Sequence, residues 1–148
     1  NSRLVLALST AFAAQCIALL DSEGGGVHFR GKSSSGKTTA LQIAASVYGA
    51  PEFMRTWRAT DSALESVAAL HSDMLLPLDE IGQLDPRAAG PAAYMLANGC
   101  GKSRSHRDGS AREATRWRVL FLSTGEVGLS PIWSRSPAAK RAPGTRCA

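Results

Sequence analysis

Cysteine is scarce in this sequence, with three residues among 148. Cys16, Cys100 and Cys147 form no C-x-x-C pair, and their number is odd. A disulfide framework or a zinc site needs cysteines in groups, so neither is expected. We therefore predict a reducing compartment, the cytoplasm, and we expect Cys16 and Cys100 to be small residues that are buried or half-buried.

A long apolar run is also missing. The longest extends from Leu4 to Leu20, contains three polar residues and is shorter than the ~20 residues that a membrane span needs. Its basic start and the residues Ala11-Phe12-Ala13 also fit a secretory signal. We favour a packed helix, and we expect no membrane partner. Because the chain begins with Asn1, we interpret it as a fragment or a processed product.

Acidic residues are absent from residues 131–148, which contain four basic ones. Ser, Pro, Ala, Arg and Lys dominate this segment without hydrophobic periodicity, a composition typical of disorder. We therefore predict a core at residues 1–130 and a disordered or aberrant basic tail at residues 131–148.

The core has the composition of a soluble globular domain, since 44% of the chain is hydrophobic and 20% is charged. Apolar periodicity predicts strands that alternate with helices. This alternation favours right-handed crossovers and a mainly parallel sheet flanked by helices, an α/β fold. The predicted strands are 27–30, 53–57, 74–80 and 117–124, and the predicted helices are 4–20, 37–48, 62–71 and 87–97.

The strongest motif follows the first predicted strand. Gly31, Gly36, Lys37 and Thr38 match G-x-x-x-x-G-K-[ST], the pattern of a phosphate-binding loop. The glycines let backbone N–H groups turn toward phosphate oxygens, and the helix N-terminus favours an anion. The pattern predicts that Lys37 meets the outer phosphates and that Thr38 binds Mg²⁺. The predicted nucleotide-binding residues are Gly31, Lys32, Ser33, Ser34, Ser35, Gly36, Lys37, Thr38 and Thr39.

A serine-rich turn can match this pattern by chance. The order strand, loop and helix is the context that supports a true phosphate-binding loop. Leu41, Ala44, Ala45 and Tyr48 follow at helical spacing, so this context is present. We therefore predict ATP and Mg²⁺ as the ligands.

Two acidic residues, Asp79 and Glu80, end the predicted strand that begins at Met74. The carboxyl ends of parallel strands gather functional groups at one edge of a sheet. We expect Asp79 to share the Mg²⁺ with Thr38 and Glu80 to orient and deprotonate a water for attack on the γ-phosphate. The alternative is that the two acids cap the next turn.

The last predicted strand ends in the polar residues Ser123-Thr124-Gly125-Glu126, and a hydroxyl there, assigned to Ser123, could contact the γ-phosphate or the attacking water. The alternative is an ordinary turn at the end of a strand. Trp57 and Trp117 are expected in the core rather than as platforms for base stacking.

The segment from Gly99 to Thr115 is rich in glycine and arginine and is predicted to form a loop or a hairpin. Such a segment could follow a nucleic-acid backbone. Alternatively, Arg104 or Arg107 could act as an arginine finger on the ATP of a neighbouring subunit, or the loop could be a solvated charged surface. The predicted nucleic-acid contacts are Lys102, Arg104, Arg107 and Arg112.

Several separate motifs together resemble the bacterial domain of unknown function 927, over about residues 4–129. They are Gly24–Gly31, Arg55–Asp61, Leu78–Gln83, Tyr94–Gly99 and Trp117–Glu126. That family is similar to helicase-like P-loop ATPases of phages, plasmids and integrated elements.

The resemblance implies a P-loop NTPase of RecA-like or AAA+-like type, in the class with an added strand and a catalytic glutamate. It also implies work on single- or double-stranded DNA in replication or mobilisation, and a homo-oligomer in the intact protein. After Ser130 the resemblance ends, so we expect a member that is truncated or frameshifted at the C-terminus, with hydrolysis in doubt. The alternatives are a nucleic-acid-binding module with a decayed ATP site and a P-loop phosphotransferase.

Overall fold

The computed structural model describes residues 2–105 and 111–127. Four parallel strands form one sheet in the order β1-β6-β3-β2, with bounds Gly25–Arg30, Val119–Gly125, Met74–Asp79 and Arg55–Thr56. The last strand among the described residues, β6, therefore lies between β1 and β3. This arrangement confirms the predicted α/β fold with a parallel sheet flanked by helices. The predicted tail, residues 131–148, lies outside the described residues.

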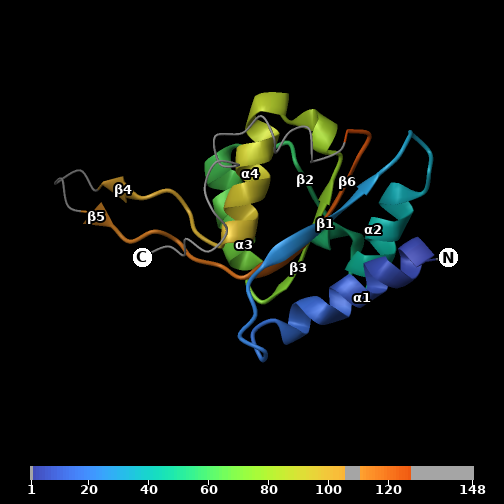
Figure 1. Cartoon of the computed structure of the whole chain (residues 1–148), viewed down its shortest axis with the longest axis horizontal. Helices are drawn as coiled ribbons and strands as arrows, with labels where there is room; N and C mark the ends of the chain where they lie inside the picture. Colours follow the sequence, from blue (N-terminus) through green and yellow to red (C-terminus); the bar gives the residue numbers. More distant parts are fainter. Residues whose placement is uncertain (1, 106–110, 128–148) are drawn as a thin grey trace.

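Two pairs of helices cover the two faces of the sheet (Figure 1). The helices α1 (Ser2–Cys16) and α2 (Lys37–Ala45) lie on one face, and α3 (Asp61–Leu70) and α4 (Pro86–Asn98) lie on the other. Short 3₁₀ turns, η1 (Pro51–Phe53) and η2 (Ile81–Gln83), follow α2 and β3. Among the described residues, none of these helices combines the length and the apolar character needed to cross a bilayer.

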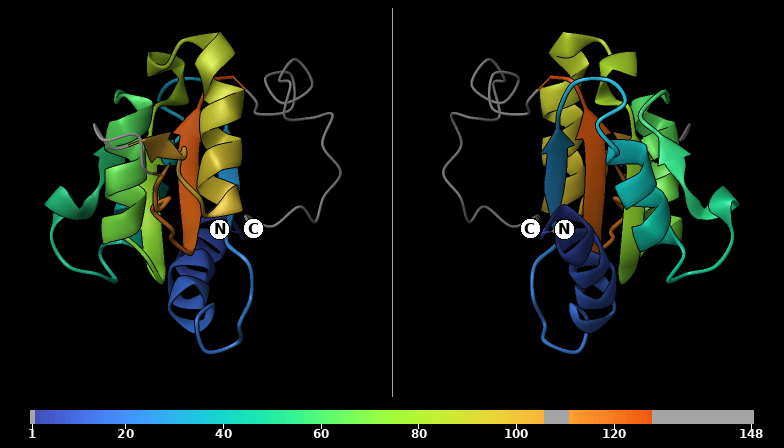
Figure 2. Two further views of the ribbon diagram at one scale, coloured as in Figure 1. Left: turned by 90° about the vertical axis from the view of Figure 1, so that its left-hand side faces the viewer. Right: turned by 90° about the vertical axis from the view of Figure 1, so that its right-hand side faces the viewer.

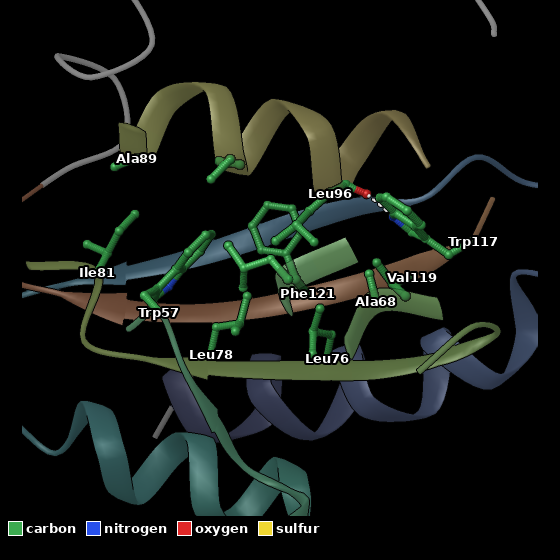
Figure 3. Close-up of a cluster of buried hydrophobic side chains, with 13 residues drawn as sticks. Trp57, Ala68, Leu76, Leu78, Ile81, Ala89, Leu96, Trp117, Val119 and Phe121 are labelled. Carbon is green, nitrogen blue, oxygen red and sulfur yellow. Dashed lines mark hydrogen bonds between the residues drawn. The ribbon is translucent and has the colours of Figure 1, made fainter. Parts of the chain in front are cut away.

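The larger buried cluster fills the space between the sheet and α3/α4 (Figure 3). Trp57 is fully buried there, and its ring meets the ring of Phe121 edge-on at a centroid distance of 6.2 Å. Trp117 donates its indole N–H to the Leu96 carbonyl oxygen at 3.1 Å, so its one polar group is satisfied inside the core. Both tryptophans are therefore core residues, as predicted.

The basic segment forms a hairpin, as predicted. Its short strands β4 (Arg104–Ser105) and β5 (Ala111–Arg112) pair antiparallel and project from the α3/α4 side (Figure 1). The base of the hairpin is fixed to α3 in two ways: Lys102 pairs with Asp61 at 2.6 Å, and its backbone N–H donates to the buried Glu65 carboxylate at 3.2 Å. The position of the hairpin is therefore set by α3.

The predicted elements differ most clearly from the observed ones at two places. The first helix ends at Cys16 rather than at residue 20, because the chain turns there, with Leu20 N–H donating to the Cys16 carbonyl and Asp21 at a φ of 46°. Cys16 is exposed, so the prediction that it is buried or half-buried was wrong, whereas Cys100 is half-buried as predicted. The predicted strand 53–57 shrinks to Arg55–Thr56 because η1 occupies its start.

Candidate nucleotide-binding site

The loop between β1 and α2 has the backbone geometry that its glycines suggest. Gly36 adopts a φ of 79°, in the left-handed region, and it is the residue that caps α2. Gly31 is restricted in a different way, since an added Cβ would lie 2.7 Å from the Ser35 Oγ. The Gly31 N–H donates to the Gly125 carbonyl at 3.1 Å, which ties the start of the loop to β6. The loop therefore arches over the edge at which β1 and β6 end (Figure 2).

The side chain of Lys37 lies across this loop. Its Nζ donates to the Gly31 and Lys32 carbonyl oxygens, both at 2.8 Å, and the residue is 9% exposed. These are carbonyls of the same loop whose N–H groups would face an anion. The ammonium is therefore held at the loop by hydrogen bonds to neutral acceptors, and a phosphate oxygen would be a stronger partner. Lys32, Ser33, Ser34, Ser35 and Thr39 are exposed around it.

Thr38 and Asp79 meet at this edge, although they are 41 residues apart in the sequence. The Thr38 hydroxyl lies 3.3 and 3.4 Å from the two Asp79 carboxylate oxygens. Helix α2 supplies the first residue and strand β3 the second, so the fold creates the contact. A hydroxyl and a carboxylate are hard oxygen donors of the kind that Mg²⁺ prefers when phosphates complete its shell. The donor set therefore fits the predicted Mg²⁺, which Thr38 and Asp79 would hold.

Glu80 has a different position from that of Asp79. Its φ of 54° is in the left-handed region, which is uncommon outside glycine. Its Oε1 accepts from the Gly82 N–H at 3.2 Å and so caps η2. The Glu80 side chain therefore caps the next turn, which is the alternative considered from the sequence. Activation of a water by Glu80 stays a prediction, and it requires the carboxylate to leave this cap.

The hydroxyl beside the two acids belongs to Thr124, and the prediction for Ser123 was wrong about position. Successive side chains of a strand point to opposite faces. Thr124 lies on the α2 face, where its hydroxyl donates to Asp79 Oδ1 and accepts from the Glu80 N–H at 3.0 Å. Ser123 lies on the other face, fully buried, where its Oγ accepts from the Trp57 indole N–H at 2.8 Å.

A histidine that sequence reasoning missed completes the arrangement around Ser123. His28 Nδ1 lies 3.0 Å from the Ser123 Oγ, and His28 Nε2 lies 2.9 Å from the Val127 carbonyl oxygen. A carbonyl only accepts, so Nε2 carries the proton, and the Ser123 hydroxyl donates to Nδ1. Burial lowers the pKa of His28 below its usual 6.5, which agrees with this neutral ring. The pairing of β1 with β6 places His28 opposite Ser123, a register that the sequence does not reveal.

The predicted basic contacts that the structure describes, Lys102, Arg104 and Arg112, belong to the hairpin and its base. Lys102 is engaged by Asp61, so its charge is compensated. Arg104 and Arg112 stand opposite each other in the backbone register of β4 and β5. Arg107 lies outside the described residues. Within residues 2–105 and 111–127, no group of three or more His, Cys, Asp or Glu side chains could hold a metal.

Comparison with known proteins places this geometry in context. A solved chain titled "SCCmec type IV Cch - active helicase" has a similar fold, with a TM-score of 0.61 at 23% sequence identity. The similarity covers 88% of this chain but 24% of that one, so the present chain spans about a quarter of its length.

No curated protein matches this sequence. A family model, "Domain of unknown function (DUF927)", matches residues 1–116, which include the phosphate-binding loop, the two acids and both short strands of the hairpin. This match confirms the resemblance inferred from the motifs. Because it covers most of the chain, the chain belongs to the DUF927 family.

Proposed function

We propose that this chain binds ATP with Mg²⁺ and hydrolyses it as part of a helicase-like motor on DNA. The observation that carries the proposal is the contact of Thr38 with Asp79, 3.3 Å apart at the mouth of the phosphate-binding loop. A chance serine-rich turn has no reason to bring a threonine hydroxyl against a carboxylate from another strand. The helicase title of a structural neighbour agrees with a motor of this type, since that protein carries a similar fold.

The roles of the residues follow from their positions. The loop N–H groups and the N-terminus of α2 would bind the phosphates, and Lys37 would exchange its two carbonyl acceptors for phosphate oxygens. Thr38 and Asp79 would hold Mg²⁺, which supplies positive charge against the phosphate oxygens. Glu80 would hold a water for in-line attack and accept its proton once its carboxylate leaves the Gly82 N–H.

Nucleotide chemistry can be tested directly on the wild-type chain, Lys37→Ala and Glu80→Gln. We expect Lys37→Ala to weaken ATP binding by about 10- to 150-fold, because hydrogen bonds to a charged group contribute about 1.5–3 kcal/mol. Glu80→Gln should bind ATP normally and release no phosphate. Arg3→Ala, at an exposed site on α1, is the control for both measurements and should behave as wild type. Wild-type protein that binds no ATP would contradict the proposal and favour a module with a decayed site.

Product analysis separates a motor from a phosphotransferase. A motor releases inorganic phosphate when no acceptor molecule is present, and DNA should raise the rate. A phosphotransferase would instead release phosphate slowly and modify an added small molecule. Phosphate release that needs an acceptor would favour this second candidate.

DNA is proposed to bind along the β4–β5 hairpin. The support is the composition of residues 102–118, with six basic and two acidic residues, and the fixed base of the hairpin on α3. Replacing Arg104, Arg107 and Arg112 by Ala should weaken binding of unrelated DNA sequences alike and flatten the dependence of log affinity on log salt by about 0.9 per lost phosphate contact. If the slope is unchanged, these arginines do not contact DNA phosphates. They would then act as arginine fingers in a homo-oligomer or form a solvated surface.

A further inference from the structure

Thr124 touches both acids of the candidate site through a single hydroxyl. The Glu80 backbone N–H donates to its Oγ1 at 3.0 Å, and Oγ1 in turn donates its proton to Asp79 Oδ1. The residue is 1% exposed, so water does not compete for these hydrogen bonds. The hydroxyl therefore joins the side chain of one acid to the backbone of the next.

We propose that Thr124 is a positioning residue that fixes the Asp79 carboxylate for Mg²⁺ and the Glu80 turn for catalysis; this inference rests on the proposed ATP site. Asp79 is approached by two hydroxyls, that of Thr38 from α2 and that of Thr124 from β6. Two donors from different elements define the orientation of a carboxylate, whereas one donor leaves it free to rotate. Residues that orient a metal ligand in this way govern metal affinity without touching the metal.

The backbone of Glu80 gives the second reason. Its left-handed φ of 54° is unfavourable for a residue with a Cβ and persists only when neighbouring contacts hold it. Three hydrogen bonds hold it here: its N–H donates to Thr124, its carboxylate accepts from the Gly82 N–H, and its carbonyl accepts from the Gln83 N–H at 3.1 Å. When the Glu80 carboxylate leaves Gly82 to act on water, the bonds to Gln83 and Thr124 remain, and the bond to Thr124 is the one that ties the turn to another strand. Thr124 therefore keeps the turn in place while Glu80 works.

Strand β6 is itself held firmly at this point. Ser123, the preceding residue, is bound on the opposite face of the sheet by Trp57 and His28. The tip of β6 is thus fixed on both faces, and Thr124 has a rigid base from which to orient the acids. This distinguishes Thr124 from a buried threonine that merely satisfies its own hydroxyl.

The test compares Thr124→Val, which keeps the shape and removes the hydroxyl, with Thr124→Ser, which keeps the hydroxyl. Thr10→Val is the matched control, because Thr10 is also buried and its hydroxyl bonds only to the Leu6 carbonyl of α1. Binding of a fluorescent ATP analogue is measured with EDTA and then along a Mg²⁺ titration. We expect Thr124→Val to bind the analogue as wild type does in EDTA but to need about tenfold more Mg²⁺ for half of the Mg²⁺-dependent gain.

For Thr124→Ser, the Mg²⁺ concentration at half of the gain should lie within about threefold of the wild-type value, and for Thr10→Val it should equal that value. Hydrogen exchange of the Glu80 amide gives a readout that needs no nucleotide, and it should be faster in Thr124→Val alone. The inference is overturned if Thr124→Val keeps the wild-type Mg²⁺ midpoint, or if Thr124→Ser is as impaired as Thr124→Val. A wild-type chain that binds no analogue would instead refute the proposed ATP site, while the exchange of the Glu80 amide still tests its contact with Thr124.

Discussion

The two faces of the sheet are built from different kinds of side chain. The α3/α4 face buries two tryptophans, Phe121 and several leucines. The α1/α2 face buries mostly alanines, with Phe29 and a few leucines among them. Small residues let α1 and α2 lie close to each other and to the sheet, whereas large ones bury more apolar area per residue. The α1/α2 face is therefore suited to close approach, and the α3/α4 face to stability.

The chemistry of the candidate site lies on the alanine-rich face. Helix α2 begins at the phosphate-binding loop, and both Asp79 and Thr124 face it. The aromatic-rich face supports the site from behind, since Trp57 holds Ser123 at the tip of β6. This contrast predicts that substitutions on the aromatic-rich side alter stability, whereas substitutions at the edge of the alanine-rich side alter ligand binding.

The largest effect is expected for Leu76→Ala. Leu76 is fully buried in the α3/α4 cluster, so its truncation should lower the free energy of unfolding by about 2–5 kcal/mol through lost burial and a cavity. Urea denaturation measures this loss. Leu19→Ala, at a side chain that is 85% exposed, should change stability by no more than about 0.5 kcal/mol. If Leu76→Ala and Leu19→Ala changed the free energy of unfolding equally, the α3/α4 face could not be the one that provides stability.

A smaller loss of stability, caused by overpacking rather than by a cavity, is expected for Ala11→Leu. Ala11 is fully buried where α1 meets the sheet, so added methylenes should cost about 1–3 kcal/mol through overpacking. Ala13→Leu, at an exposed position of the same helix, is the control. If the urea midpoint of Ala11→Leu equals that of Ala13→Leu, close packing is not what limits this face.

Thr38→Val should alter ligand binding and leave stability alone. Thr38 is exposed, and within the described part of the chain its hydroxyl contacts only Asp79, at 3.3 and 3.4 Å. The gain in ATP affinity on adding Mg²⁺ should fall about tenfold, which corresponds to about 1.4 kcal/mol. Thr115→Val, an exposed threonine near the base of the hairpin, serves as the control. Calorimetric titration with and without Mg²⁺ measures the difference.

The smallest effect is a dependence of stability on pH. Burial lowers the pKa of both His28 and His71 below 6.5, so the unfolded chain binds more protons than the folded one. Stability should be fully present above about pH 6.5 and should decline as the pH falls from there through the folded pKa values. Urea midpoints measured between pH 7.5 and pH 5 follow this decline. His28→Gln should reduce the decline, and a profile identical to that of wild type would contradict a neutral buried His28.

The sequence predicted the elements and the loop because each depends on local chemistry. The glycines, Lys37 and Thr38 stand in one short motif, and Asp79 ends an apolar run. The assignment of Ser123 failed because Val119 to Leu122 are all apolar, so the sequence does not show which residues of β6 face α2. His28 was missed for a related reason, since its partner Ser123 is brought to it only by the pairing of β1 with β6.

The position of β6 also has a consequence for how the chain folds. Strands β1 and β3 do not pair with each other, and both pair with β6, which ends at Gly125. During synthesis, the phosphate-binding loop and the acids emerge from the ribosome long before the strand that joins them. Contacts of high sequence separation slow folding. The nascent chain therefore cannot complete the described sheet until β6 has emerged, and the nucleotide proposed to bind there would stabilise the sheet only from that point on.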